Sequence, residues 1–207
     1  LSTFAMAQSD GIARMAVRFL RAMGLRDLDR AGQGDGGGET HGARILFLGF
    51  YRTASSLIAD LEKEDPELLR DICVVDFNPV VYANLHRRNV RVLYGDVSQR
   101  ETLVHAGIDR AEIIVSSVPD YLLKGSTNAR LVRQVRSLNA KAVVIAPADT
   151  LAEIGQLYEA GADYVTVYRF TNALDLRGAL SAALAGPIDE KRAQLDAKMT
   201  DRTEVLP

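Results

Sequence analysis

The sequence predicts an α/β fold in which a doubly wound parallel sheet of six strands carries helices on both faces. From residue 43 onward, six short runs rich in β-branched residues alternate with helical stretches, which is the pattern of successive strand–helix–strand units. Most of these runs are apolar along their whole length, as expected of parallel strands that are covered on both faces. The predicted strands are 44–49, 72–76, 90–94, 113–117, 142–146 and 164–168, and the predicted helices are 53–64, 80–88, 99–106, 124–138, 150–160 and 171–185.

Residues 1–30 are predicted to form a separate unit built around a basic amphipathic helix. Its apolar residues recur at helical spacing and its arginines share another face, namely Ile12, Met15, Phe19 and Met23 against Arg14, Arg18 and Arg21. This helix either packs on the following domain with a solvated arginine face or lies at a membrane surface through residues 10–26. Arginines just cytoplasmic of a membrane-spanning segment would also satisfy the positive-inside rule.

The next segment, residues 31–42, has the sequence AGQGDGGGETHG, in which six of twelve positions are glycine. This composition predicts a flexible linker and a domain boundary. The sheet domain is expected to occupy residues 43–186, because Gly186 and Pro187 break the last predicted helix. The strongly charged residues 187–207 are expected to form a short exposed helix or a frayed tail, without a second domain.

The composition narrows the classes of function. A net charge of −2 at pH 7 gives no support for nucleic-acid binding. Three scattered histidines and the single cysteine, Cys73, lack metal-ligand spacing, so no metal site and no internal disulfide are expected. No run is long and apolar enough to span a bilayer, so the chain is expected to be soluble; because it begins with Leu1, we expect a fragment. The motifs of dehydrogenases, serine hydrolases and phosphate-loop enzymes are missing, so binding rather than catalysis is expected.

The stretch ILFLGFYRTASSL, residues 45–57, places the turn Gly49-Phe50 between the first strand and the next helix. The start of that helix offers free backbone N–H groups and a positive dipole end to an anion. Tyr51 stands where the fingerprint G-x-G-x-x-G has its second glycine, so its side chain either occupies the space in which a pyrophosphate approaches the backbone or rotates outwards, to stack on a base or pack on the helix. Arg52 can offer a bidentate hydrogen bond to a phosphate. The turn therefore favours a mononucleotide such as AMP over a dinucleotide.

Three other strand ends complete the predicted site. Asp76 in VVDFNP lies 27 residues beyond Gly49 and can accept hydrogen bonds from ribose hydroxyls. In YGDV, Asp96 can accept a hydrogen bond from an adenine amino group, and the small serines of SSVPD leave room for a ribose or phosphate. Either acid could instead cap the helix that follows it. The candidate binding residues are Gly49, Phe50, Tyr51, Arg52, Asp76, Phe77, Asn78, Gly95, Asp96, Val97, Ser116 and Ser117.

The motifs ARILFLGF, ICVVDFNP, VRVLYGDVSQRETLVHAGIDRAEIIVSSVPD, STNARLVRQVRSLNA and YEAGADYVTVY resemble, in this order, the RCK (TrkA-N) domain, the cytosolic regulator of K⁺ channels, Trk uptake systems and Kef-type antiporters. The resemblance covers residues 43 to about 170. Residues 1–27 resemble the segment that leaves the last membrane helix of Kef-type cation:proton antiporters.

This resemblance implies a Rossmann-like domain that dimerises, binds NAD(H), AMP or ATP, and couples the bound ligand to transport. The residues that it matches to binding positions are Gly49, Asp76, Asp96, Ser116 and Ser117. It matches Asn128 to the family asparagine that opens the fifth helix. The sequence departs from the family at Tyr51, and at Ala146, where many members have an arginine. We also expect the separate RCK-C subdomain to be missing, since only a short tail follows.

We therefore expect the cytosolic nucleotide-sensing regulatory domain of a monovalent cation (K⁺ or Na⁺):proton antiporter, on the cytoplasmic side of the inner (cell) membrane. Its expected partners are the membrane transport domain of the same chain and a second copy in a homodimer, and its expected ligand is an adenine nucleotide, with AMP favoured over NAD(H) or ATP. Two alternatives remain open. One is a dimerisation or interaction module with a vestigial nucleotide pocket, and the other is a methyltransferase-like domain that binds S-adenosylmethionine.

Overall fold

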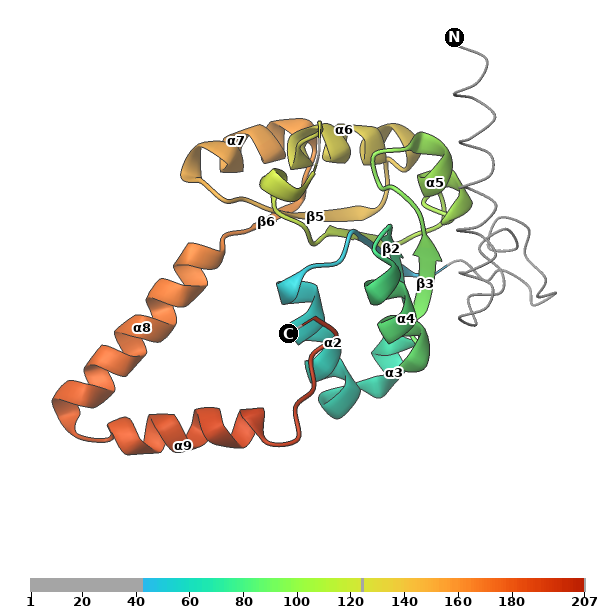
Figure 1. Ribbon diagram of the computed structural model, residues 1–207. Helices are drawn as coiled ribbons and strands as arrows, with labels where there is room; N and C mark the ends of the chain where they lie inside the picture. Colours follow the sequence, from blue (N-terminus) through green and yellow to red (C-terminus); the bar gives the residue numbers. More distant parts are fainter. Residues whose placement is uncertain (1–42, 124, 207) are drawn as a thin grey trace, which may run out of the picture. The chain divides into compact units, whose positions relative to one another are not determined.

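Six parallel strands form a single sheet in the computed structural model, which describes residues 43–123 and 125–206 (Figure 1). Across the sheet the strands run in the order β3-β2-β1-β4-β5-β6. The chain therefore starts in the middle, builds one half outward and then crosses to the other side of β1, as predicted for a doubly wound sheet. The strands are β1 Ile45–Leu48, β2 Ile72–Asp76, β3 Arg91–Tyr94, β4 Ile113–Ser116, β5 Val143–Pro147 and β6 Tyr164–Thr166.

Helices cover both faces of this sheet, so the predicted fold class is confirmed. One face packs against α2 and α4, in a core that contains Phe47, Ile58 and Leu85. The other packs against α5, α6 and α7, in a core that contains Leu46 and Leu131. Between the strands lie α2 Arg52–Glu64, α3 Pro66–Leu69, α4 Pro79–Arg87, α5 Arg100–His105, the 3₁₀ helix η1 Asp120–Leu122, α6 Asn128–Leu138 and α7 Leu151–Ala160.

Strands that are apolar along their whole length follow from this double coverage. In β1, Leu46 and Leu48 point into one core whereas Phe47 points into the other. Neighbouring residues of β2 divide in the same way, since Val74 and Val75 belong to different cores and both are fully buried. Alternation of apolar and polar residues is therefore absent, because neither face of these central strands is solvated.

Several boundaries differ from the prediction. The helix expected at 124–138 begins at Asn128, because the hydroxyl of Thr127 accepts a hydrogen bond from the N–H of Arg130 and caps it. Between α2 and β2, where no helix was predicted, Asp65 caps the short helix α3, and Pro66 occupies its first turn, where a proline is tolerated. Helix α8 begins at Tyr168, three residues earlier than predicted, and β6 ends correspondingly earlier.

The chain after the sheet consists of two helices and an extended segment. Helices α8 Tyr168–Ala185 and α9 Ile188–Met199 contain no buried residue. The break predicted at Gly186 and Pro187 is present, and Gly186 has the left-handed conformation that ends α8. The sequence predicts a short exposed helix or a frayed tail for residues 187–207, and α9 matches the first alternative. Residues 202–206 nevertheless pack against the domain, and Val205 is buried in the same core as α2 and α4. The basic helix predicted within residues 1–30 and the linker predicted at 31–42 lie outside the described residues.

Candidate functional site

The carboxyl end of β1 lies between the ends of β2 and β4, because Leu48 is in register with Val75 on one side and with Ser116 on the other. Chain connections leave β1 and β4 toward opposite faces at this point, which is where doubly wound sheets form a ligand crevice. A cavity of about 540 Å³ opens there. It is lined by Gly49, Phe50, Tyr51, Arg52, Asp76, Phe77, Asn78, Pro79, Val97, Val118, Leu122, Leu123 and Leu206.

Gly49 forms the tight turn between β1 and α2. Its φ of +75° lies in the left-handed region, and a Cβ at this position would come within 2.6 Å of Cγ1 of Val118. The turn is held from both sides, since the Gly49 N–H donates to the carbonyl of Val75 at 2.8 Å and its carbonyl accepts from the Ser117 hydroxyl at 2.6 Å. A side chain is therefore excluded both by conformation and by space.

Asp76, at the end of β2, connects two turns of the crevice. Its carboxylate accepts a hydrogen bond from the N–H of Phe50 at 2.7 Å and another from the N–H of Asn78 at 2.7 Å. Burial raises the pKa of Asp76 above its ordinary value, although these two hydrogen bonds act in the opposite direction. A carboxylate accepts about four hydrogen bonds, so it can still accept from a ligand hydroxyl.

Tyr51 and Arg52 lie at the entrance, where α2 begins. Tyr51 precedes α2 without a side-chain capping hydrogen bond, and the first turn contains no acidic residue. The Tyr51 ring packs edge-on against that of Tyr121 in η1, with centroids 6.5 Å apart and the two hydroxyls 3.3 Å apart. The guanidinium of Arg52 lies 5.7 Å from the centre of the Tyr51 ring. Two tyrosines thus bridge the loops that follow β1 and β4.

The other predicted binding residues are not among those that line this cavity, although the hollow at Asp96 shares Phe77 and Val97 with it. Asp96 lines a smaller neighbouring hollow of about 190 Å³, and its carboxylate accepts a hydrogen bond from the N–H of Ser98. Gly95 is required by a close approach, because a Cβ there would lie 2.5 Å from Cγ2 of Thr102. Both residues therefore have a structural part in the turn that leads into α5.

Ser116 and Asn128 bind each other rather than face the large cavity. The Ser116 hydroxyl donates to the side-chain oxygen of Asn128, whose amide group donates to the carbonyl of Val118 at 2.9 Å and to Asp120 at 2.7 Å. Asn128 lines a cavity of only about 50 Å³. This buried network ties the end of β4 to the start of α6.

Sequence reasoning missed several apolar wall residues. Leu122 is the last residue of a 3₁₀ helix and Leu123 follows it directly, and this helix is too short to produce a periodic pattern in the sequence. Leu206 lies more than a hundred residues after Gly49 and Asp76 in the sequence, so only the folded chain brings it to the crevice. Within the described ranges, no three histidine, cysteine or acidic side chains group as a metal site would require. Among the helices in these ranges, none is both long enough and apolar enough to cross a membrane.

The strand order and the crevice define a Rossmann-like α/β domain. The family model of the TrkA-N domain matches residues 45–168, which is more than half of the chain. The chain therefore belongs to the TrkA-N domain family. No curated protein matches it in sequence.

Among solved structures, the TrkA-N domain of the inner membrane protein YbaL from Escherichia coli is 21% identical with a TM-score of 0.58, and the match covers 67% of this chain and 96% of that one. The GsuK channel bound to NAD is 26% identical with a TM-score of 0.54 over 74% of this chain. GsuK bound to ADP is also 26% identical, with a TM-score of 0.50 over 69% of this chain. The matched parts are 26% and 35% of those two chains.

Proposed function

We propose that this chain is the cytosolic nucleotide-sensing regulatory domain of a monovalent cation (K⁺ or Na⁺):proton antiporter, and that an adenine nucleotide binds in the crevice at Gly49. One observation carries the nucleotide site: a single cavity joins Arg52 and the start of α2 to the Asp76 carboxylate and to apolar walls. These are the three chemistries that a phosphate, a ribose and a base require. Nucleotides in the GsuK structures, NAD in one and ADP in another, support the same ligand class.

The shape of the crevice favours a mononucleotide such as AMP. Its volume of about 540 Å³ lies in the lower half of the range for small-molecule sites, roughly 300–1,000 Å³. On the other side of β4, where a dinucleotide would place its second half, the cavity at Asn128 has only about 50 Å³. The Tyr51–Tyr121 pair joins the loop that follows β1 to the loop that follows β4. NAD(H) and ATP are the alternative ligands.

Homodimer formation is supported by apolar side chains on α8. Leu176, Leu180 and Leu184 follow one another at intervals of four residues and therefore share one side of the helix, where they are 60%, 58% and 91% exposed. An exposed apolar stripe of this kind marks an interaction surface. We assign it to a second copy of this chain.

The transport context rests on the resemblance of residues 1–27 to the segment that follows the last membrane helix of Kef-type antiporters. A ligand can shift the transporter only by the difference between its affinities for the two transport states. The bound nucleotide is therefore expected to change the geometry of the dimer, and contacts of the domain surface with the membrane transport domain to transmit the change. This arrangement places the domain at the cytoplasmic face of the inner (cell) membrane.

Calorimetric titration of the chain with AMP, ADP, ATP, NAD⁺, NADH and S-adenosylmethionine tests the proposal. We expect AMP to bind most tightly and Asp76→Ala to abolish binding, whereas Asp71→Ala, which removes a surface carboxylate paired with Arg44, should bind like the parent chain. A folded protein that binds none of the six compounds would contradict the nucleotide site and leave a dimerisation module. Preferential binding of S-adenosylmethionine would instead favour the methyltransferase-like alternative.

A further inference from the structure

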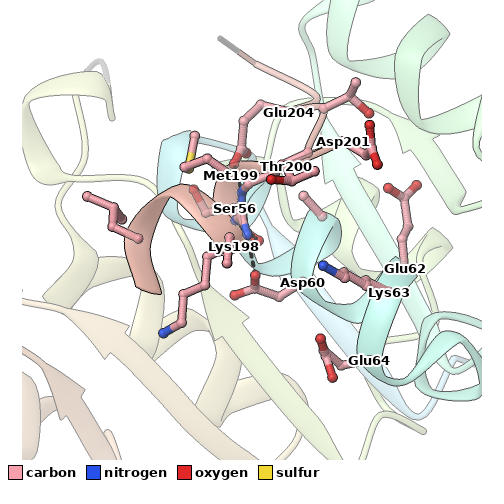
Figure 2. A pocket seen from close by; sticks show the side chains of 15 residues that line it. Ser56, Asp60, Glu62, Lys63, Glu64, Lys198, Met199, Thr200, Asp201 and Glu204 are labelled. Carbon is pink, nitrogen blue, oxygen red and sulfur yellow. Dashed lines mark hydrogen bonds and ion pairs between the residues drawn. The ribbon is translucent and has the colours of Figure 1, made fainter. Parts of the chain in front are cut away.

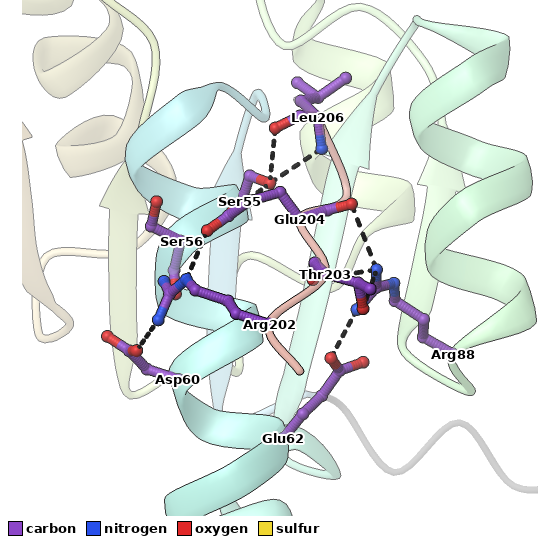
Figure 3. A network of polar contacts seen from close by, with 9 residues as sticks. All are labelled: Ser55, Ser56, Asp60, Glu62, Arg88, Arg202, Thr203, Glu204 and Leu206. Atoms are coloured by element: carbon purple, nitrogen blue, oxygen red, sulfur yellow. Dashed lines mark hydrogen bonds and ion pairs between the residues drawn. The ribbon is translucent and has the colours of Figure 1, made fainter. Parts of the chain in front are cut away.

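Residues 202–206, which we call the strap, lie in a groove between α2 and α4 (Figure 3). Three successive strap carbonyls accept hydrogen bonds from the side chains of Asn84 on α4 and Arg88, which directly follows it. Arg88 donates to the carbonyls of Thr203 and Glu204, both at 3.2 Å, and Asn84 donates to that of Val205 at 3.0 Å. The carbonyl of Leu206 lies 3.2 Å from the hydroxyl oxygen of Ser55 on α2. Recognition of consecutive backbone groups is typical of a peptide-binding site.

Ser55 and Val205 fix the register of the strap. The Ser55 hydroxyl is fully buried, accepts a hydrogen bond from the N–H of Leu206 at 2.8 Å, and lies 2.8 Å from the carboxylate of Glu204. Val205 is 2% exposed and packs in the core with Ile58 of α2 and Leu85 of α4. A shift of the strap by one residue would remove Val205 from this core, so the groove selects one register.

Arg202 anchors the other end of the strap to α2. Its guanidinium donates to the carbonyl of Ser56 at 2.7 Å and to the carboxylate of Glu204 at 2.7 Å, and it pairs with Asp60. The Arg202 side chain is only 16% exposed. Such an arginine is protected in the docked strap and becomes accessible when the strap leaves the groove.

Helices α8 and α9 contrast with the strap that follows them. Neither helix contains a buried residue. The pair is attached to the domain at its two ends, because α8 directly follows β6 and α9 is followed by the docked strap. Between α9 and α2 lies an open cavity of about 1180 Å³, bordered by Lys63 and Lys198 among other polar side chains (Figure 2). Docking of the strap therefore determines where the α8–α9 pair is held.

The strap also reaches the proposed nucleotide crevice, because Leu206 lines that cavity together with Phe50 and Pro79. Leu206 does not fill the crevice, which has about 540 Å³ with the strap in place. A ligand can thus occupy it without displacing Leu206 and gains apolar contact with this side chain only while the strap is docked.

We propose that the groove between α2 and α4 is a peptide-binding surface for the strap, and that docking of the strap completes the wall of the nucleotide crevice. This inference rests on the proposed nucleotide site. The ligand contacts Leu206 in the docked state alone, so ligand and strap each strengthen the binding of the other by the same factor. Ligand binding then holds the α8–α9 pair, and with it the exposed leucines of α8, in one position.

Two pairs of variants of the full chain test this coupling. Arg88→Ala removes a strap contact outside the crevice, and its matched control, Arg70→Ala, removes an arginine whose ion pair with Glu67 is exposed. Leu206→Ala removes the wall contact, and Leu195→Ala truncates an exposed leucine of α9. We expect each strap variant to bind AMP roughly fivefold more weakly, in the usual range of coupling between sites, and each control to bind like the parent chain.

Limited trypsin digestion supplies a second readout, because cleavage after Arg202 requires a released strap. Cleavage there should be faster in Arg88→Ala than in Arg70→Ala, and AMP should slow it in the parent chain, with cleavage after Lys141, which is exposed between α6 and β5, as the internal reference. Equal AMP affinity in all variants, while Arg88→Ala is cut faster, would overturn the coupling and leave the proposed nucleotide site intact. Failure of the folded parent chain to bind AMP, ADP or NAD⁺ would instead overturn the nucleotide site and the coupling together.

Discussion

The carboxylate of Asp76 accepts the backbone N–H of Phe50 at 2.7 Å, so the residue that ends β2 fixes the turn that follows β1. Its other oxygen accepts the N–H of Asn78 at the same distance. Two loops of the crevice are thereby held by one side chain before any ligand arrives. This preorganisation reduces the ordering that a ligand would otherwise have to bring about.

Asp76→Asn is expected to destabilise the domain and weaken nucleotide binding. An asparagine has one oxygen and one NH₂ group, so one of the two backbone N–H groups faces another donor. We expect a loss of roughly 1–3 kcal/mol in the free energy of unfolding, the usual range for an unsatisfied buried group. Urea denaturation measures it. Asp71→Asn, at a surface ion pair, should cost less than about 1 kcal/mol, and equal losses in both variants would contradict the bridging role.

Gly49→Ala is expected to destabilise the turn for two separable reasons. The left-handed conformation costs a non-glycine residue roughly 1–2 kcal/mol, and the new methyl group would meet Val118 at 2.6 Å. Adding Val118→Ala should relieve the contact but not the backbone strain. Gly155→Ala in α7, where the added Cβ meets open space, should instead stabilise by about 0.5–1 kcal/mol. Thermal and urea unfolding of the four proteins measures both contributions.

Tyr51→Gly is expected to change the preference between mononucleotide and dinucleotide. Removing the ring opens the approach to the start of α2 and ends the contact with Tyr121. We expect the ratio of NAD⁺ to AMP affinity to rise by about tenfold, which corresponds to ~1.4 kcal/mol. Tyr51→Phe keeps the ring and loses only the hydroxyl contact, so its ratio should remain that of the parent chain. An unchanged ratio in Tyr51→Gly would show that this ring does not determine ligand size.

The sheet and the turn at Gly49 could be predicted because their signals are local. Buried parallel strands are short apolar runs, and a glycine between a strand and a helix marks a tight turn. Asp76 was also identifiable from its place at a strand end. Its two hydrogen bonds to the turns, however, depend on the register of β1 and β2, which the spacing of residues along the chain does not contain.

The strap could not be predicted because its signal is neither periodic nor local. Val205 and Leu206 are two apolar residues at the end of a strongly charged segment, and a pattern of that length does not distinguish a docked peptide from a frayed tail. Their partners on α2 and α4 are more than a hundred residues away. Asn128 illustrates a related difficulty, since its type and position suit a ligand contact whereas its hydrogen bonds are made within the protein.

The contribution of Glu204 to stability is expected to disappear at acidic pH. Burial alone would raise the pKa of Glu204, but hydrogen bonds from Arg202 and Ser55 outweigh it and lower the pKa. A carboxyl whose pKa is lower in the folded state stabilises it above its unfolded pKa, about 4.3 for glutamate, and loses this effect as the pH falls through the folded value. Glu204→Gln should therefore be less stable than the parent chain at pH 7, and the difference should shrink below about pH 4. Urea denaturation at both pH values measures it, and a difference independent of pH would contradict the charge-dependent contact.

Leu184→Asp is expected to weaken the proposed homodimer. Leu184 is 91% exposed in the single chain, so the substitution leaves the folded monomer intact but places a charge in any apolar interface formed by α8. Analytical ultracentrifugation of the parent chain should give twice the monomer mass, and that of Leu184→Asp a dimer dissociation constant raised by at least about tenfold, equivalent to ~1.4 kcal/mol. Val104→Asp changes an exposed apolar residue on α5 and should leave the dimer unchanged. Equal association of both variants would exclude this side of α8 from the interface, because a charge can be tolerated there only where no partner covers it.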